Sequence, residues 1–498
     1  MKALRQVEKD ELEALSSLRE LADQAFSRAA GAPVVGGNHV SLLRDAEENY
    51  PAWLAAIRAA RRHIHFETYI FYDDDTGREF ADALIAKARD GVTVRLIYDW
   101  LGNFGKGSRR LWNALREAGV QVRCYNPPQL DSPLGWLSRD HRKMLAVDGE
   151  VAFITGLCVG RVWKGDPKRG IAPWRDTGVE IRGCAVADVE RAFARMWALT
   201  GEPLPASARI ETPAPAGDMS MRIVATEPAT AGMLRLDQLI AALARERLWL
   251  TDAYYAGTTS YVEALRAAAR DGVDVRLLLP NSTDIPLLRP LSRAGYRALL
   301  EAGVRIFEWN GSMLHAKTAL ADRNWARVGS TNLNIASWFG NCELDAVVED
   351  ESFAAAMEQM YLEDLANATE VVLDKRRRAR TPDRPRQPHH LRGSGSAGRA
   401  IAGASRIGHT IGAAFADRRE LGPIEARLAL LGGALLCLLA VVALLFPRLL
   451  AYPLAGLGMW GGLALMYQGW RLLRARRAAR TVAQNSPSRQ GDDAGKEG

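Results

Sequence analysis

Two segments of the chain place a histidine two residues before a lysine, with an aspartate five residues after that lysine. They read SRDHRKMLAVDGE and SMLHAKTALADRN. Imidazole and ammonium groups suit chemistry at a phosphodiester, because one histidine can attack phosphorus, a second can protonate the leaving oxygen, and lysines can offset the charge on the phosphoryl oxygens. The pattern predicts one catalytic site formed by both segments, with the reactive residues His141, Lys143, His315 and Lys317.

These segments belong to a longer internal repeat. DGVTVRLIYD and EAGVQVRCYN precede the first motif, and the similar DGVDVRLLLP and EAGVRIFEWN precede the second in the same order. A repeat of about domain length indicates a duplicated unit. Because side chains alternate along a strand, the His and Lys of each motif share one face. Both pairs converge if the two copies pack face to face.

The elements that must position these residues alternate along each copy. β-Rich runs such as VTVRLIYD alternate with helical stretches such as GREFADALIAKARD, which predicts an α/β fold with two pseudo-symmetric domains, each a mixed sheet flanked by helices. The stretch TGEPLPASARIETPAPAGD, rich in Pro, Ala and Gly, marks the boundary between them. We predict an N-terminal helical segment over residues 1–40, then domains over 41–205 and 206–373.

The C-terminal part has a different composition. We predict a basic Pro-rich linker over residues 374–400 and an amphipathic helix on the membrane surface over 401–420. A transmembrane hairpin over 424–471 and a disordered tail over 472–498 follow. The two predicted spans, 428–446 and 449–470, are apolar and close to the roughly 20 residues that cross a bilayer. Arginines gather on both outer sides of the hairpin, so both ends are predicted to be cytosolic.

Charge is distributed unevenly along the chain. After residue 374 there are 21 Lys and Arg against 7 Asp and Glu, whereas the residues before hold 44 against 51. A mildly acidic catalytic part argues against a nucleic-acid groove, which needs a basic surface. The basic linker instead predicts attraction to an anionic membrane surface.

Cysteine spacing and the N-terminal sequence point to the same compartment. The five cysteines form no C-x2-C pair, and the charged N-terminus lacks the apolar run of a signal peptide. Neither the cysteines nor the histidines show the spacing of a metal site. We therefore expect a reducing compartment, no metal and no cofactor.

The motifs resemble those of a known superfamily. HRKMLAVDGEVAFITG and HAKTALADRNWARVGSTN resemble the paired HxKxxxxD motifs of the phospholipase D superfamily, and HFETYIFYDDDTG, RLIYDWLG, PWRDTGVEIRG and NCELDAVVED resemble segments of bacterial cardiolipin synthases. The resemblance covers about residues 45–370. It implies a two-domain α/β fold with one site at the pseudo-dyad, a phosphohistidine intermediate, and no metal.

The resemblance also implies roles for individual residues. His141 is the expected nucleophile and His315 the expected general acid, although two such histidines can exchange roles. Lys143 and Lys317 are expected to bind phosphate. Asn332 matches the phosphate-contacting asparagine of the family, with Ser330 beside it in the substrate site. The equivalent position in the first copy is Cys158, a departure from the family pattern.

Four acidic residues complete the motif positions. Glu343 and Asp176 match the acids that orient the two histidines, where a carboxylate on the far ring nitrogen fixes the tautomer. Asp148 and Asp322 end the repeated motifs, and we expect them to be structural salt-bridge partners.

Further residues lie near the first motif. Glu67 and Tyr69 occupy positions that line the substrate pocket in the family. His63 and His65 share one strand face, and we expect them to be satisfied by neighbouring groups and not catalytic.

The leading functional prediction is a phosphatidyltransferase of the cardiolipin synthase type, with phosphatidylglycerol as substrate, in the bacterial inner membrane with its catalytic domains on the cytosolic side. Because water can replace the acceptor alcohol, a phospholipase D hydrolase that releases phosphatidic acid is the first alternative. A phosphodiesterase or nuclease of the same superfamily is the second. A non-catalytic membrane scaffold is the third.

Overall fold

A computed structural model describes residues 23–128, 138–284, 292–373 and 379–380, with scattered positions between 441 and 470. The chain divides into two compact units. The first unit comprises residues 1–127 and 138–424 and contains every strand and helix named below. Of the second unit, only the scattered positions beyond residue 440, together with Pro128, are described.

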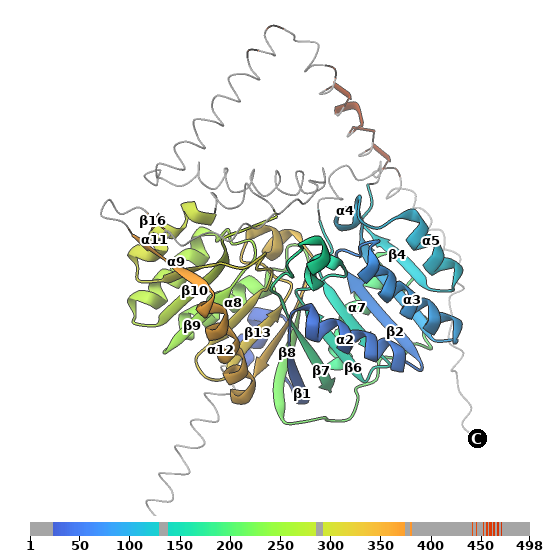
Figure 1. The fold of residues 1–498 in the computed structure, drawn as a ribbon, viewed down its shortest axis with the longest axis horizontal. Coiled ribbons are helices and arrows are strands. Elements are labelled where there is room, and N and C mark those ends of the chain that lie inside the picture. Colours follow the sequence, from blue (N-terminus) through green and yellow to red (C-terminus); the bar gives the residue numbers. More distant parts are fainter. Residues whose placement is uncertain are drawn as a thin grey trace, which may run out of the picture. The chain divides into compact units, whose positions relative to one another are not determined.

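The first unit is built on one 16-stranded mixed sheet (Figure 1), in the order β16-β15-β11-β10-β9-β12-β13-β14-β8-β1-β7-β6-β5-β2-β3-β4. The strands of the N-terminal half are β1 Val35–Arg44, β2 His63–Thr68, β3 Thr93–Asp99, β4 Gln121–Tyr125, β5 Lys143–Val147, β6 Val151–Thr155 and β7 Thr177–Gly183. Those of the C-terminal half are β8 Met219–Thr226, β9 Arg247–Thr251, β10 Asp274–Pro280, β11 Arg305–Trp309, β12 Thr318–Ala321, β13 Trp325–Gly329, β14 Glu343–Glu349, β15 Ala368–Leu373 and β16 Ala379–Arg380.

The two halves repeat the same strand pairing. In the first, β2, β3 and β4 are parallel, and β5, β6 and β7 continue the sheet antiparallel. In the second, β9, β10 and β11 are parallel, and β12, β13 and β14 follow antiparallel. The halves join where β1 pairs with β8. The predicted α/β fold with a mixed sheet and two similar domains is confirmed.

Helices cover both faces of the sheet. They are α2 Asp45–Ala59, α3 Asp75–Arg89, α4 Trp100–Asn103, α5 Arg109–Glu117, α6 Arg161–Lys164 and α7 Val186–Leu199, then α8 Gly232–Leu243, α9 Thr259–Arg270, α11 Tyr296–Glu301 and α12 Glu351–Ala366. Short turns of other helix types are η2 Pro167–Arg169 and η3 Ala336–Gly340. Sequence explains α3 directly: Asp74 caps its first turn by accepting from the Gly77 N–H at 3.0 Å, and Phe80, Ala81 and Leu84 form its buried face.

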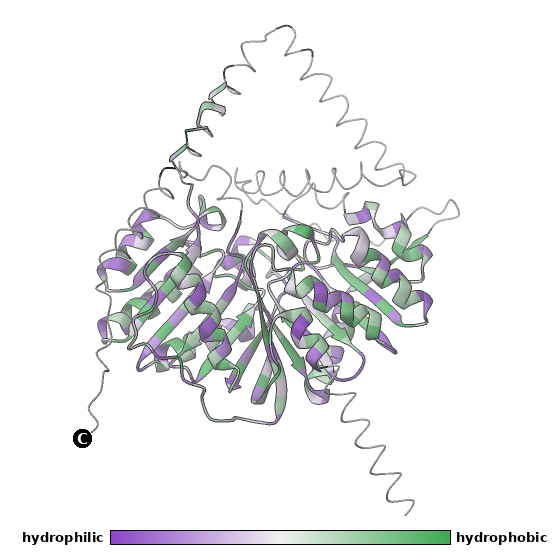
Figure 2. Cartoon of the chain, turned by 180° about the vertical axis from the view of Figure 1, so that it is seen from behind, coloured by the Kyte–Doolittle hydropathy of each residue, from purple (hydrophilic) through white to green (hydrophobic). Residues whose placement is uncertain are grey.

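Three hydrophobic clusters hold these layers together. One cluster joins α7 and α12 over the middle of the sheet and is shared by both halves. The other two lie under α2, α3 and α5 in the first half and under α8, α9 and α11 in the second. Along β5, Met144 and Ala146 belong to the shared cluster, whereas Leu145 and Val147 face the first-half cluster. A strand buried on both faces is mainly apolar, as the largely green strands in Figure 2 show.

Some predicted segments differ from the structure or lie outside its described part. β1 begins at Val35, inside the segment 1–40 predicted to be helical, because this strand is needed to join the halves. Residues 401–420 and 472–498 and most of the linker lie outside the described residues, as does most of the predicted hairpin. In the part of the chain that is described, no helix has the length and apolar character of a bilayer span.

Candidate active site

The two repeated motifs meet at the junction between the halves. His141 precedes β5, and its backbone N–H donates to the Cys342 carbonyl at 2.9 Å. His315 precedes β12, and its N–H donates to the Arg175 carbonyl at 2.7 Å. Both histidines are about 95% buried, at 4% and 5% exposure. Backbone pairing across the halves therefore fixes where each imidazole lies.

Each histidine is paired with an acid from the other half. His141 Nδ1 lies 2.8 Å from Glu343 Oε2, and His315 Nδ1 lies 2.7 Å from Asp176 Oδ2. A carboxylate at Nδ1 holds the proton on that nitrogen and fixes the orientation of the ring. The arrangement leaves Nε2 as the ring nitrogen suited to nucleophilic or acid-base chemistry.

A lysine and a tyrosine accompany each histidine. The lysines Lys143 and Lys317 donate to the backbone carbonyls of His141 and His315, respectively. The Lys143 ammonium lies 5.2 Å from the Tyr69 ring, which contacts the His141 ring with centroids 4.9 Å apart. Two ammonium groups at one buried junction form a site suited to an anion.

Tyr254 is the counterpart of Tyr69 in the second half. Its ring lies 5.9 Å from the Lys317 ammonium and 5.8 Å from the His315 ring, between centroids. Sequence reasoning missed this residue. The signal was present, since the tyrosine follows the second-half strand β9 as Tyr69 follows β2.

Burial shapes the electrostatics of the second-half pair. It lowers the pKa of His315 to about 4, with Lys317 contributing in the same direction against Asp176. Burial also lowers the pKa of Lys317 to about 8. For Asp176 burial alone would raise the pKa, but His315 and Lys317 bring it below the ordinary value. Asp176 is thus an anion paired with a neutral imidazole and with a lysine that loses its proton near pH 8.

Asn332 lies fully buried near this junction. Neither its amide nitrogen nor its amide oxygen has a hydrogen-bond partner in the described part of the chain. A buried amide without partners costs free energy, so such a group in a native protein calls for a partner such as a ligand, an ion or an ordered water. In the first half Cys158 is also buried, and burial raises the pKa of its thiol. Only the second half therefore supplies an amide at this position.

Ser330 supports Glu343. Its hydroxyl donates to Glu343 Oε2 at 2.6 Å and accepts from the Leu344 N–H at 2.9 Å. Asn341 Nδ2 donates to the other carboxylate oxygen at 3.2 Å. Burial raises the pKa of Glu343, while Lys143 and these donors oppose the shift. Ser330 thus holds the carboxylate that orients His141, and its predicted contact with substrate stays a prediction.

Glu67 also differs from its predicted place in the substrate pocket. Along the β2–β5 pairing Thr68 stands opposite Lys143, and Glu67 stands opposite Met144. Since successive residues of a strand face opposite sides, Glu67 points to the other face of the sheet from Lys143. There it is fully buried, and burial raises its pKa beside Asp140.

The motif aspartates anchor backbone. Asp148 accepts from three successive N–H groups at 2.7 to 2.8 Å at the start of β2. Asp322 accepts from three successive N–H groups at 2.8 to 3.2 Å at the start of β9. Both have positive φ, 55° and 49°. The salt bridges predicted for these residues are thus replaced by bonds to backbone N–H groups.

The chain is similar to a known protein family and to several known proteins. The family model described as "Cardiolipin synthase, PLD-like domain" matches residues 53–159 and 238–365. The cardiolipin synthase of Halalkalibacterium halodurans is 30% identical over 385 residues, covering 74% of this chain and 75% of that protein. Cardiolipin synthase A of Pseudomonas fluorescens is 33% identical over 367 residues, covering 72% and 74%. The crystal structure of phosphatidylserine synthase from Haemophilus influenzae shares the fold, with a TM-score of 0.57 at 13% identity over 70% of this chain and 91% of that one.

Proposed function

The chain belongs to the cardiolipin synthase family of phospholipase D-like phosphatidyltransferases, and from this premise we propose that it transfers a phosphatidyl group from one phospholipid to a hydroxyl group of another. The observation that carries the proposal is the pair of buried histidines, each held by a carboxylate of the opposite half. Phosphatidylglycerol suits both roles, because it contains the phosphodiester and the free hydroxyls.

The first half-reaction breaks the bond to the leaving alcohol. Nε2 of His141 attacks phosphorus, a P–N bond forms, and the P–O bond to the headgroup breaks while His315 gives its proton to the leaving oxygen. A neutral His315 must first take up a proton, and the anionic phosphodiester bound beside it favours this step. Lys143, Lys317 and Asn332 bind the phosphoryl oxygens and stabilise the negative charge.

The second half-reaction reverses the first with a new alcohol. His315 takes the proton of the acceptor hydroxyl, the acceptor oxygen attacks phosphorus, and the P–N bond breaks to release His141. Water in place of the alcohol would give phosphatidic acid. The outcome therefore depends on which hydroxyl reaches His315.

A cavity beside His315 offers a place for a headgroup. It has a volume of about 280 Å³ and is lined by Arg44, Asp45, Pro173, Trp174, Arg175, Trp309, Ser312 and Asp364. The Trp174 ring lies 5.4 Å from the His315 ring, between centroids, so this lining residue contacts the catalytic group. Indole faces and carboxylates suit a glycerol moiety, since the faces are apolar and carboxylates accept from hydroxyls.

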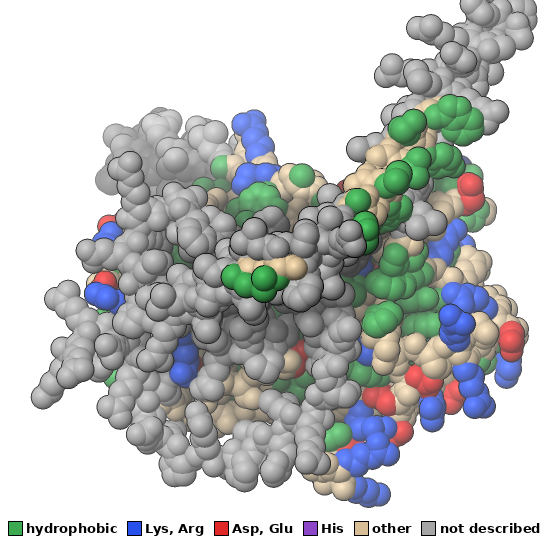
Figure 3. All heavy atoms as spheres, turned by 90° about the horizontal axis from the view of Figure 1, so that it is seen from above, with side chains coloured by type: hydrophobic (Ala, Val, Ile, Leu, Met, Phe, Trp, Pro, Cys, Tyr) green, Lys and Arg blue, Asp and Glu red, His purple; other side chains and the backbone are tan. Residues whose placement is uncertain are grey.

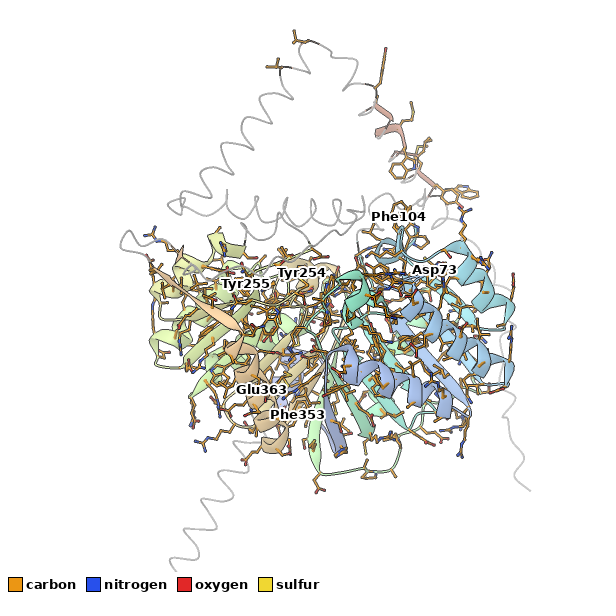
Figure 4. The ribbon with its side chains drawn as sticks, in the orientation of Figure 1. Asp73, Phe104, Tyr254, Tyr255, Phe353 and Glu363 are labelled. Carbon is orange, nitrogen blue, oxygen red and sulfur yellow. The ribbon has the colours of Figure 1, made fainter. Side chains whose placement is uncertain are left out.

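We further propose that the protein works at the cytosolic face of the bacterial inner membrane. The apolar segments 428–446 and 449–470 are proposed to span the bilayer, and the basic linker to lie on its anionic surface. Figure 4 places Phe104, Tyr254 and Tyr255 toward one end of the first unit. Where described residues are visible in the view from above, Lys and Arg side chains lie beside Asp, Glu and hydrophobic ones (Figure 3). Since Tyr254 contacts His315, this end is suited to meet the membrane.

An assay of the purified full-length protein in detergent tests the proposal. Labelled phosphatidylglycerol should give cardiolipin and glycerol, whereas phosphatidic acid as the sole product would show hydrolysis instead. His141→Ala and His315→Ala should each abolish turnover, and near wild-type activity in either variant would exclude the shared site. A rapid alkaline quench, which preserves the P–N bond, should trap the labelled phosphorus of the donor lipid on His141; label on His315 would reverse the two roles.

A further inference from the structure

A second group of chemically capable residues lies away from the catalytic histidines. His63 and His65 project from one face of β2, and Glu190 on α7 lies across from them. Glu190 Oε1 is 2.7 Å from His63 Nε2 and 3.7 Å from His65 Nδ1, and the two imidazole centroids are 4.6 Å apart. The three side chains therefore converge on one point at the start of β2, whereas Tyr69 and the active site follow its other end.

Two of the three ligand groups are deeply buried. His65 is 2% exposed and Glu190 is 3% exposed, while the His63 side chain retains 23% exposure. His65 Nδ1 has no hydrogen-bond partner in the described part of the chain, although a carboxylate oxygen lies nearby. A buried ring nitrogen of His65 thus lies beside a buried carboxylate without a hydrogen bond to it.

We propose that His63, His65 and Glu190 bind a divalent transition-metal ion such as zinc, with water as the fourth ligand. In a tetrahedral site with bonds of about 2.0–2.1 Å, neighbouring ligand atoms lie about 3.3 Å apart. The separations of 2.7 and 3.7 Å bracket this value, and all three ligand atoms lie within 4.8 Å of one another, so side-chain shifts bring them into tetrahedral geometry. The exposed side of His63 gives the ion an entry path and a position for water.

The neighbouring residue Arg95 opposes binding of the ion. Arg95 Nη1 lies 3.2 Å from His65 Nε2, and Arg95 Nε donates to Gln121 Oε1 at 3.2 Å. A metal on Nδ1 leaves the proton of His65 on Nε2, where it faces another donor. Arg95 must give up this contact when the ion binds. Arg95→Gln should therefore strengthen binding, because an amide oxygen can accept the Nε2 proton and orient the ligand.

The ion would connect a strand to the helix that covers it. β2 carries two of the ligands and α7 the third, and the N–H of His63 is already held by Asp148. Binding would thus stabilise the first half and take no part in phosphatidyl transfer. The inference is independent of the proposed reaction.

Metal binding by the full-length protein in detergent tests the site. After dialysis against EDTA, the protein is titrated with Zn²⁺ by calorimetry and with Co²⁺ by visible absorption, which reports tetrahedral coordination. Wild type should bind one ion that Glu190→Gln and His63→Ala each weaken at least about tenfold, and Arg95→Gln should bind more tightly. His39→Ala, at an exposed histidine of β1, is the matched control and should bind like wild type.

A second measurement guards against misfolded variants. Zn²⁺ should raise the Tm of wild type and of His141→Ala, but not that of Glu190→Gln, whose Tm in EDTA should stay close to the wild-type value in EDTA. No binding by wild type, or binding unchanged in Glu190→Gln, would overturn the proposal. Loss of binding in His141→Ala would also overturn it, since the ion would then belong to the catalytic histidines.

Discussion

His141 and Glu343 form a 2.8 Å contact between the two halves of the chain, although 202 positions separate them. His315 and Asp176 repeat the relationship in the opposite direction. Neither half contains both members of a pair, so the orienting carboxylates reach the histidines only when the continuous sheet has formed. The duplicated fold thus produces one site and not two.

The first prediction concerns the two carboxylates that each hold a histidine of the opposite half. Glu343→Gln and Asp176→Asn keep the shape but remove the charge that fixes the imidazole tautomer, and each should lower kcat/KM by about 10²- to 10⁴-fold. The measurement is conversion of labelled phosphatidylglycerol. Glu79→Gln, an exposed position of α3, should be unaffected. If both variants keep activity within about threefold of wild type, these carboxylates do not orient the histidines.

The second prediction concerns pH. Burial lowers the pKa of Lys317 to about 8, and the charged form is the one that binds phosphate. The kcat/KM should therefore fall as pH rises above about 8. Lys317→Arg cannot lose its charge in this range, so its lower residual activity should lack the alkaline decrease. Lys164→Arg, at an exposed lysine, should keep the wild-type profile; an alkaline limb retained by Lys317→Arg would assign it to another group.

The same shift makes a prediction about stability. Below pH 8 the folded protein carries a buried ammonium, whereas between about pH 8 and 10.5 only the unfolded state keeps this proton. The unfolded state then binds more protons, so the contribution of Lys317 to the free energy of unfolding increases with pH across this window. Urea denaturation of wild type and Lys317→Arg across this range should show the increase in wild type alone.

Substitution of Asn332 should lower activity without lowering stability. Asn332→Leu removes a buried amide without partners, so the free energy of unfolding should stay equal or rise by up to about 1–2 kcal/mol. Turnover should fall at least about 10²-fold if the amide binds the phosphoryl group. Asn49 is the matched control, because its amide donates to two carbonyls and Asn49→Leu should destabilise the fold. A marked loss of stability in Asn332→Leu would show that the amide is structural.

Sequence was sufficient for the α/β fold with two similar domains, because strand alternation and the internal repeat are visible in it, and the paired motifs predict that the histidines and lysines share one site. Glu343 and Asp176 were predicted through the family resemblance, and each lies beside a motif histidine. The register of strand pairing cannot be read from the sequence, and this register decides on which face of the sheet a side chain lies. This explains Glu67, which lies one position from Thr68 yet faces away from Lys143. The bond between Ser330 and Glu343 also depends on register, since β14 brings Glu343 to the Ser330 hydroxyl.

Substitution of a motif aspartate should lower the free energy of unfolding without lowering kcat. Asp148→Ala leaves three successive N–H groups without their acceptor and should lower the free energy of unfolding by about 2–4 kcal/mol. Asp148→Asn retains one oxygen and tolerates the positive φ of 55°, so it should lose less. Denaturant midpoints and kcat are measured on the same samples. Equal stability of the Ala and Asn variants would contradict the anchoring role.

The last prediction concerns contact with the membrane. Phe104 is 48% exposed, and its ring contacts Trp100 with centroids 5.4 Å apart. The following residues include exposed Arg109 and Arg110. An aromatic side chain beside two cations suits the interface of an anionic bilayer, where the ring enters the headgroup layer and the cations meet phosphates.

Phe104→Ser should therefore lower turnover about three- to tenfold on anionic vesicles, since burial of a Phe side chain contributes about 1.5–3 kcal/mol when complete and less when partial. On short-chain substrate in mixed micelles the variant should match wild type, because the catalytic residues are unchanged. Leu362→Ser is the control, with 41% exposure next to Glu363, which Figure 4 places away from Phe104. If Phe104→Ser and Leu362→Ser retain equal activity on vesicles, this end of the molecule does not meet the membrane through Phe104.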